Sequence, residues 1–426
     1  MFFLNKCFFS VKNRLIVLAQ KGFLGKRIRI DACIGRGRHS EQVSADIIVS
    51  KRKKICDKYA GVRLWGNGCG KRIGEFISCY LLMAKKAESL TDGFLNVMVD
   101  IEGANGALVQ ILSRSFPVVT KDNAYEWNKI LKGVKNIDFS HYEIGNRHRM
   151  ADVFSFDWCK RFFYMTDSEL EEGATRSKKM GLNEPFVCIS ARDKAFLNSL
   201  YPNIDTTYHN YRDSNFANRK LTIDYLASKG IQTVRMGKIV EKYYDFPNCI
   251  EYYRDYYDEF MDMYLFHKCK FAIGDSNGLL LVPLCNNGNV VFTNITPVVG
   301  GWGGSPVVLN GIYLFKKMYS KKMNRFLNLT EMVDMDFSCN FNGHKYAEHG
   351  IELIENSPEE ILEAAKEMNE RLDGTWTDTH ESLERQKLFN EFRKDMMVKH
   401  NILEGDINWC RIGDHFLRSN WEIFGL

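Results

Sequence analysis

Phe186-Val187-Cys188-Ile189-Ser190-Ala191-Arg192-Asp193 is a short apolar run that ends in polar residues. Residues 270–274, followed by Asp275-Ser276-Asn277-Gly278, repeat this pattern, and two more short runs lie at 230–237 and 289–292. Helix-length segments separate the runs. Short β-type runs that alternate with helical patterns are typical of βαβ units on a parallel sheet. The sequence therefore predicts the α/β fold class.

The same alternation occurs earlier in the chain. Residues 62–65 and 94–99 predict strands, and a glycine-rich turn at 66–71 leads from the first of them into an apolar helix that starts near Phe76. The turn matches neither a Walker A motif nor a strict G-x-G-x-x-G motif. It predicts that some bound group approaches the backbone closely at a helix start.

We expect two Rossmann-like domains, because 426 residues are too many for one ordinary core. Their predicted bounds are 61–175 and 176–400, after a basic segment at 1–60. Helices at the end of the second domain and a tail at 401–426 would dock on the body. The segment 300–304 is rich in glycine and predicts either a lid or a plain connector.

The composition excludes several classes of protein. A net charge of +5 is small for this length and gives no indication of nucleic-acid binding. The twelve cysteines include no C-x-x-C pair, which favours a reducing compartment and argues against a zinc site. No run of about 18 apolar residues is present, so we expect no membrane span.

The first 40 residues are basic, with nine Lys or Arg and one acid, Asp31. Two interpretations stay open. The segment is either a first helix that packs on the body, or an amphipathic helix that holds the protein against an anionic membrane surface.

Two pairs of acids raise the question of a divalent metal: Asp100 with Glu102, and Asp334 with Asp336. Such pairs occur by chance in a chain with 53 acids, so we expect no metal site. The chain also lacks the G-x-S-x-G, H-E-x-x-H and protein-kinase motifs. What remains is arginine and glycine at the ends of predicted strands, where open parallel sheets bind their ligands. Since the arginine fork bonds phosphate oxygens in pairs, this edge predicts an anion-binding rim.

Several short motifs carry a resemblance to a known family. They are Arg72-Ile73-Gly74, Ser190-Ala191-Arg192-Asp193, Tyr211-Arg212-Asp213-Ser214, Val234-Arg235-Met236-Gly237, Gly274-Asp275-Ser276-Asn277-Gly278 with Val282-Pro283, and Pro358-Glu359-Glu360-Ile361 with Glu367-Met368. With these motifs the sequence resembles a bacterial family of predicted glycosyltransferases from surface-polysaccharide gene clusters. The family has a GT-B architecture, in which two Rossmann-like domains face a central cleft, and a distant likeness to fucosyltransferases. The match spans roughly residues 60–400.

The resemblance implies that the second domain binds a nucleotide-sugar donor. Arg192 would meet the diphosphate and assist its departure, and Arg235 with Gly237 would line the nucleotide. After the later predicted strand, at 270–274, the chain would offer hydroxyl and N–H groups at a helix start. These groups belong to Asp275, Ser276, Asn277 and Gly278. The other donor-site residues that it implies are Gly74, Ser190, Asp193, Tyr211 and Arg212.

Two positions depart from the family pattern. Many relatives have a histidine where this chain has Ser190, and another directly after the Ile-Gly of the first motif, where this chain has Glu75. A carboxylate can act as a general base, so Glu75 is the candidate for activating the acceptor hydroxyl. Its alternative role is that of an ordinary glutamate in the first turn of a helix. His141, His148 and His209 are lesser candidates.

The sequence thus predicts a hexosyltransferase-type glycosyltransferase that needs neither metal nor cofactor. It would move a sugar from a nucleotide-sugar donor to a cell-surface glycan or lipid-linked acceptor. We expect a cytoplasmic protein, peripheral on the inner face of the plasma membrane through residues 1–40. The alternatives are a nucleotide-sugar epimerase with the same cleft and a non-catalytic relative that binds a glycan or a partner.

Overall fold

The computed structural model describes residues 45–66, 72–100, 104–138, 161–286, 288–298, 310–338, 340–399 and 410–425. The chain divides into two compact units, Met1–Arg147 and His148–Leu426. Each unit has a parallel sheet of its own with helices connecting the strands, which confirms the predicted α/β class. Among the described residues, no helix is both long enough and apolar enough to span a bilayer.

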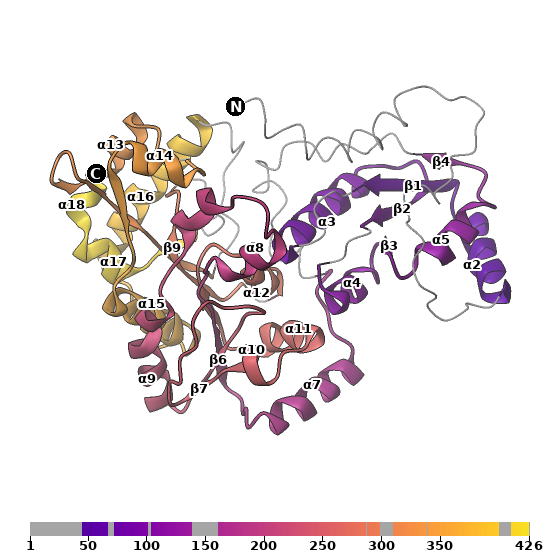
Figure 1. Ribbon diagram of the computed structural model, residues 1–426, viewed down its shortest axis with the longest axis horizontal. Helices are drawn as coiled ribbons and strands as arrows, with labels where there is room; N and C mark the ends of the chain where they lie inside the picture. The colour runs from indigo at the N-terminus through magenta and orange to yellow at the C-terminus, as the bar shows by residue number, and fades with distance from the viewer. Residues whose placement is uncertain are drawn as a thin grey trace. The chain divides into compact units, whose positions relative to one another are not determined.

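The first unit is built on a four-stranded parallel sheet in the order β3-β2-β1-β4 (Figure 1). Its strands are β1 (Gly61–Gly66), β2 (Phe94–Val99), β3 (Val118–Val119) and β4 (Ile137–Asp138). Its helices are α2 (Ala45–Lys58), α3 (Ile73–Glu88), α4 (Gly106–Leu112) and α5 (Ala124–Leu131).

Local sequence explains the elements of this unit. Val62, Leu64 and Val97 alternate along β1 and β2 and are buried in one apolar cluster with residues of β3 and α5. The helix α3, which the sequence predicts as an apolar helix, buries every residue from Phe76 to Leu81. The glycine-rich turn at 67–71 lies outside the described residues.

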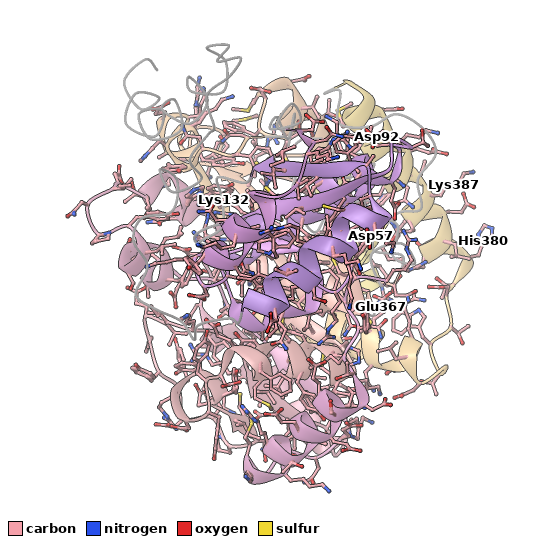
Figure 2. The ribbon with its side chains drawn as sticks, turned by 90° about the vertical axis from the view of Figure 1, so that its right-hand side faces the viewer. Asp57, Asp92, Lys132, Glu367, His380 and Lys387 are labelled. Carbon is pink, nitrogen blue, oxygen red and sulfur yellow. The ribbon has the colours of Figure 1, made fainter. Side chains whose placement is uncertain are left out.

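The helix α2 carries four consecutive basic residues, Lys51, Arg52, Lys53 and Lys54. It is held against α5 because Lys51 Nζ donates to Glu126 Oε1 at 2.5 Å and Arg52 Nη2 donates to Lys129 O at 2.6 Å. Lys53 and Lys54 are exposed. Figure 2 shows two more exposed charges of this unit, Asp57 on α2 and Lys132 directly after α5.

The second unit has a seven-stranded parallel sheet in the order β14-β10-β9-β8-β5-β6-β7. Its strands are β5 (Phe186–Ile189), β6 (Gln232–Arg235), β7 (Cys249–Ile250), β8 (Ala272–Gly274), β9 (Val290–Ile295), β10 (Ile312–Phe315) and β14 (Arg411–Ile412). All four residues of β5 are buried, as expected for a central strand with both faces covered. The strands predicted at 186–189, 230–237, 270–274 and 289–292 are confirmed.

Helices connect these strands. They are α7 (Asp167–Lys179), α8 (Ala195–Leu200), α9 (Lys220–Ser228), α10 (Tyr252–Asp255), α11 (Glu259–Lys268) and α12 (Leu281–Asn286), with 3-10 helices η3 (Thr207–Arg212), η4 (Phe216–Arg219) and η5 (Gly278–Leu280). The contact between α7 and α11 depends on Gly173, because a Cβ there would lie 1.9 Å from the ring of Tyr264.

A small antiparallel sheet, β12-β11-β13, follows the large one. It consists of β11 (Lys317–Ser320), β12 (Arg325–Phe326) and β13 (Ile351–Ile354), with α13 (Leu329–Asp334) and α14 (Gly343–Glu348) between its last two strands. The helix α15 (Pro358–Leu372) begins at a capping box of Ser357 and Glu360. It packs against α9 (Figure 1).

The last described residues dock on the large sheet. After α16 (His380–Lys399), the strand β14 pairs with β10, and α17 (Asp414–Ser419) and α18 (Trp421–Phe424) follow. Phe315 of β10 contacts Phe416 and Phe424, with ring centroids 5.0 and 5.7 Å apart. Aromatic packing therefore ties the tail to the sheet.

Candidate functional site

The candidate site lies where the neighbouring strands β5 and β8 end. Ser190 N donates to Ile273 O at 2.8 Å, and Asn277 Nδ2 donates to Ser190 Oγ at 3.3 Å. A Cβ at Gly274 would lie only 2.3 Å from Ser190 Oγ, so a larger residue there would displace this hydroxyl. The structure thus joins two segments that are some 80 residues apart in the sequence, as the strand-end rule predicts.

Asp275 is the centre of a buried polar network. Its side chain is fully buried and forms an ion pair with Arg219, with Oδ1 and Nη2 2.6 Å apart. The same carboxylate accepts hydrogen bonds from Arg192 N at 2.9 Å, from Thr293 Oγ1 at 2.7 Å, and from Ser214 Oγ. Burial opposes ionisation, but Arg219 and these donors hold the pKa of Asp275 below its ordinary value. Asp275 therefore positions the segments around the site rather than facing a ligand.

Arg192 is a buried cation of the site with an unused hydrogen-bond donor. Its Nη1 is paired with the Asp213 carboxylate, whereas its Nη2 has no hydrogen-bond partner among the described residues. Burial, and the nearby charge of Arg212, lower the pKa of Arg192 to about 9. A buried N–H group without a partner is destabilising, so this guanidinium favours an anion placed beside Nη2.

Two more cationic side chains lie near Arg192. Arg212, at the end of η3, has its Nη2 3.0 Å from Nδ1 of His209. Lys316, directly after β10, is buried and donates through Nζ to Asp213 O at 2.6 Å. Burial lowers the pKa of Lys316. Tyr211 is also buried, which raises its pKa, and its ring lies 6.0 Å from that of Tyr346 on α14.

Asp193 and Arg235 make contacts within the protein. Asp193 accepts hydrogen bonds from Ala195 N and Glu241 N, at 2.9 and 2.8 Å. Arg235, the last residue of β6, is 3.2 Å from Glu251 Oε2 and donates to Lys242 O at 2.9 Å. Gly237 follows two residues later. Their predicted role of lining the nucleotide stays a prediction.

The remaining predicted residues of this edge form the start of the next helix. Ser276 is buried, and Asn277 accepts through Oδ1 from Leu279 N at 3.0 Å. Gly278 is the first residue of η5. These contacts describe a capping turn that is bonded to Ser190.

The first unit holds the predicted base. Gly74 and Glu75 lie in the first turn of α3, and Glu75 is paired with Arg72 three residues earlier. Gly74 O accepts from Ser78 Oγ at 2.6 Å. His141, His148, Glu102, residues 300–304 and the basic segment 1–40 lie outside the described residues.

No cluster of three or more His, Cys, Asp or Glu side chains within the described ranges is arranged to hold a metal ion. Of the two acid pairs, Asp100 is buried, and Asp336 is paired with Lys345 at 2.7 Å.

Four residues of this site were not predicted from the sequence: Arg219, Thr293, Asn294 and Lys316. Asn294 Nδ2 donates to Asp275 Oδ1 at 3.1 Å and is part of the same network. Lys316 had a signal, since it ends an apolar run at 312–315 that resembles the other strands. Arg219 had none, because it lies inside a short helix rather than at the end of a strand.

The comparisons with known proteins are sparse. No model of a protein family matches the chain, and comparison with curated proteins finds no significant match. Among solved structures, the chain matches one described as the glycosyl transferase family 9 from Veillonella parvula. The two chains are 10% identical, the match covers 73% of this chain and 97% of that one, and the TM-score is 0.40. A likeness this low supports no argument about function.

Proposed function

We propose that this protein is a glycosyltransferase of GT-B type that takes its sugar from a nucleotide-sugar donor. The observation that carries the proposal is Arg192, a buried guanidinium at the carboxyl end of β5 whose Nη2 is without a hydrogen-bond partner in the described part of the chain. The resemblance of the sequence motifs indicates the class of reaction. The site adds a fixed cation, which the diphosphate of the donor requires.

A nucleotide sugar carries two phosphates that leave with the nucleotide. Negative charge grows on the bridging oxygen as the glycosidic bond breaks, and a fixed cation at that point lowers the barrier. Arg192 is such a cation, because Asp275 holds its backbone and Asp213 holds one side of its fork. Arg212 and Lys316 add positive charge nearby. No divalent metal is required in this arrangement.

The acceptor hydroxyl needs a base, and we assign this role to Glu75. It lies in the first turn of α3, where its ion pair with Arg72 fixes the position of the carboxylate. The resemblance implies that the first unit is the acceptor-binding domain. The acceptor would be a cell-surface glycan or a lipid-linked saccharide.

A lipid-linked acceptor requires access to a membrane surface. The basic segment 1–40 supports peripheral binding to anionic lipid, and Lys51, Arg52, Lys53 and Lys54 of α2 continue its positive charge. Cosedimentation with vesicles of phosphatidylglycerol, compared with phosphatidylcholine, tests this part. Binding to both or to neither kind of vesicle would contradict it.

The function is tested by incubating purified full-length protein with a panel of UDP-, GDP-, ADP- and CMP-sugars, with and without EDTA, in the presence of polysaccharide and lipid-linked acceptors. We expect release of the nucleotide from one donor and the appearance of a glycosylated acceptor, both unchanged by EDTA. Conversion of the donor sugar into its epimer without release would identify an epimerase. Binding of a glycan without turnover of any donor would identify a non-catalytic relative.

A further inference from the structure

The segment 238–248, between β6 and β7, runs beside the candidate site. Glu241 N donates to Asp193 Oδ2 at 2.8 Å, and Tyr244 OH donates to Asn215 Oδ1 at 2.8 Å. Asp193 directly follows Arg192, and Asn215 directly follows Ser214, whose hydroxyl is bonded to Asp275. Both anchors of the segment are therefore one residue away from the buried network around Arg192.

Tyr243 presents an exposed aromatic ring on this segment. Its side chain is 61% exposed, yet the ring is stacked on that of Tyr253, with centroids 5.8 Å apart and an angle of 19° between the planes. Tyr253 is buried. Tyr253 thus supports one face of the Tyr243 ring, and an exposed fraction of 61% means that the part of the ring that Tyr253 does not cover is open to solvent.

Arg235 contacts Tyr253, the buried ring of this stack. Its guanidinium lies 4.9 Å from the ring centroid of Tyr253 and 3.9 Å from that of Phe216. Its charge is balanced by Glu251, 3.2 Å away. Cation–π contacts of a desolvated arginine stabilise such a stack. An aromatic ring that is already ordered loses little entropy when a ligand stacks on it.

We propose that the open face of Tyr243 stacks against the heterocyclic base of the nucleotide whose diphosphate meets Arg192. The inference rests on the proposed function and names one more contact of the same donor. Chain connectivity through Asp193 and Glu241 keeps the Cα atoms of Arg192 and Tyr243 within about 19 Å of each other. Both side chains are long, so a nucleoside diphosphate can bridge them.

This assignment gives Arg235 a different role from the one that the sequence predicts. Arg235 positions the aromatic stack, and Tyr243 makes the contact with the nucleotide. Because every base has a π face, Tyr243 contributes affinity without choosing between purines and pyrimidines. The choice of base must come from hydrogen-bonding groups elsewhere in the site.

The test compares inorganic pyrophosphate with UDP, GDP and ADP in calorimetric titrations of the full-length protein and three variants. In Tyr243→Leu we expect the nucleoside diphosphate that binds best to lose roughly 5- to 150-fold in affinity, the loss that one base–aromatic stack gives. Affinity for pyrophosphate is expected to stay within about twofold. Tyr243→Phe should bind nucleotide as the unmodified protein does. Tyr125→Leu is the matched control, because Tyr125 is 62% exposed and lies on α5 of the first unit.

Three results would overturn the inference. Unchanged nucleotide affinity in Tyr243→Leu would exclude stacking, and an equal loss for pyrophosphate and nucleotide would show that Tyr243 acts only by shaping the segment 238–248. In both cases the proposed function would stand. If the unmodified protein bound neither pyrophosphate nor any nucleotide, the proposed function would fail first, and this inference with it.

Discussion

Two buried arginines at the ends of neighbouring strands differ in how their charge is satisfied. Arg235, at the end of β6, has a carboxylate, a backbone carbonyl and aromatic rings around its guanidinium. Arg192, after β5, has Asp213 on one side and no hydrogen-bond partner on its Nη2 among the described residues. The first is a structural cation, and the second has an unused donor. The unused donor of Arg192, rather than burial alone, is the reason why the proposed function places the anion at Arg192 and not at Arg235.

The largest effect is expected at the network that places Arg192. Arg219→Met removes the cation from Asp275 and leaves a fully buried carboxylate without its ion pair. We expect the free energy of unfolding to fall by about 3–5 kcal/mol, as measured by chemical denaturation. Arg254→Met is the control, because Arg254 forms exposed ion pairs with Asp245 and Asp255 and its loss is expected to leave the stability nearly unchanged. Similar stability of Arg219→Met and Arg254→Met would contradict the stabilising role of the ion pair between Arg219 and Asp275.

The second prediction compares the contributions of Arg235 and Arg192 to stability. Arg235→Met should lower the free energy of unfolding by about 2–3 kcal/mol, because it leaves Glu251 buried without its cation. The loss stays below that of Arg219→Met because burial already raises the pKa of Glu251 and favours its neutral form. Arg192→Met should change the stability of the ligand-free protein by less than about 1 kcal/mol, since Asp213 is partly exposed to water. Equal losses of unfolding free energy in Arg235→Met and Arg192→Met would show that the two arginines do not differ in this way.

A third prediction concerns the pH dependence of stability that arises from the helix α11. Burial raises the pKa of Asp262 on α11 to about 8, against the opposing effects of Tyr252 and Lys238 and with the support of Glu259 and Asp258. The folded protein then holds a proton that the unfolded chain releases near pH 4, so stability falls as pH rises from about 4 to 8, by at most about 1.4 kcal/mol per unit.

Asp262→Asn keeps the shape of the side chain and removes this titration. Its thermal midpoint should fall less than that of the unmodified protein when pH is raised from 5 to 8. Parallel curves for the two proteins would show that Asp262 does not titrate in this range.

Small effects are expected at the contacts that Glu241 makes with Lys194 and Asp193. Glu241→Gln removes the exposed ion pair with Lys194, 3.0 Å in length, and should change stability by less than about 0.5 kcal/mol. Asp193→Ala removes two hydrogen bonds to backbone N–H groups and should cost about 1–2 kcal/mol. Denaturation curves measure both. The reverse order would mean that the Lys194 pair, rather than Asp193, holds the segment 238–248 in place.

Local sequence patterns predicted many of the strands and helices. The apolar runs at 186–189 and 94–99 form the predicted strands, because a short apolar run between turn and helix signals is a pattern of near neighbours in the sequence. The strand-end rule also joined Ser190 to Asn277. By contrast, the prediction of the second sheet stopped before residues 300–304, so β10, β14 and Lys316 were not anticipated.

The contents of the site depend on long-range contacts that a single sequence does not carry. Asp275 was expected to offer groups to a ligand, yet it is fully buried and bonded to Arg219, Thr293 and Asn294. Arg192 and Arg235 have the same local setting, a cation that follows a β-type run. Only their partners in space, Asp213 and Glu251, distinguish them. Residue type and spacing located the edge of the sheet, and packing decided the role of each side chain.

The central claim is that Arg192 forms an anion site after β5, and a calorimetric titration with inorganic pyrophosphate tests it most directly. The unmodified protein and Arg254→Met should bind with equal affinity. Arg192→Met should bind roughly 10- to 150-fold more weakly, the range expected for a charge-assisted hydrogen bond, with its thermal midpoint unchanged. Pyrophosphate binding of equal strength in Arg192→Met and the unmodified protein would contradict the account.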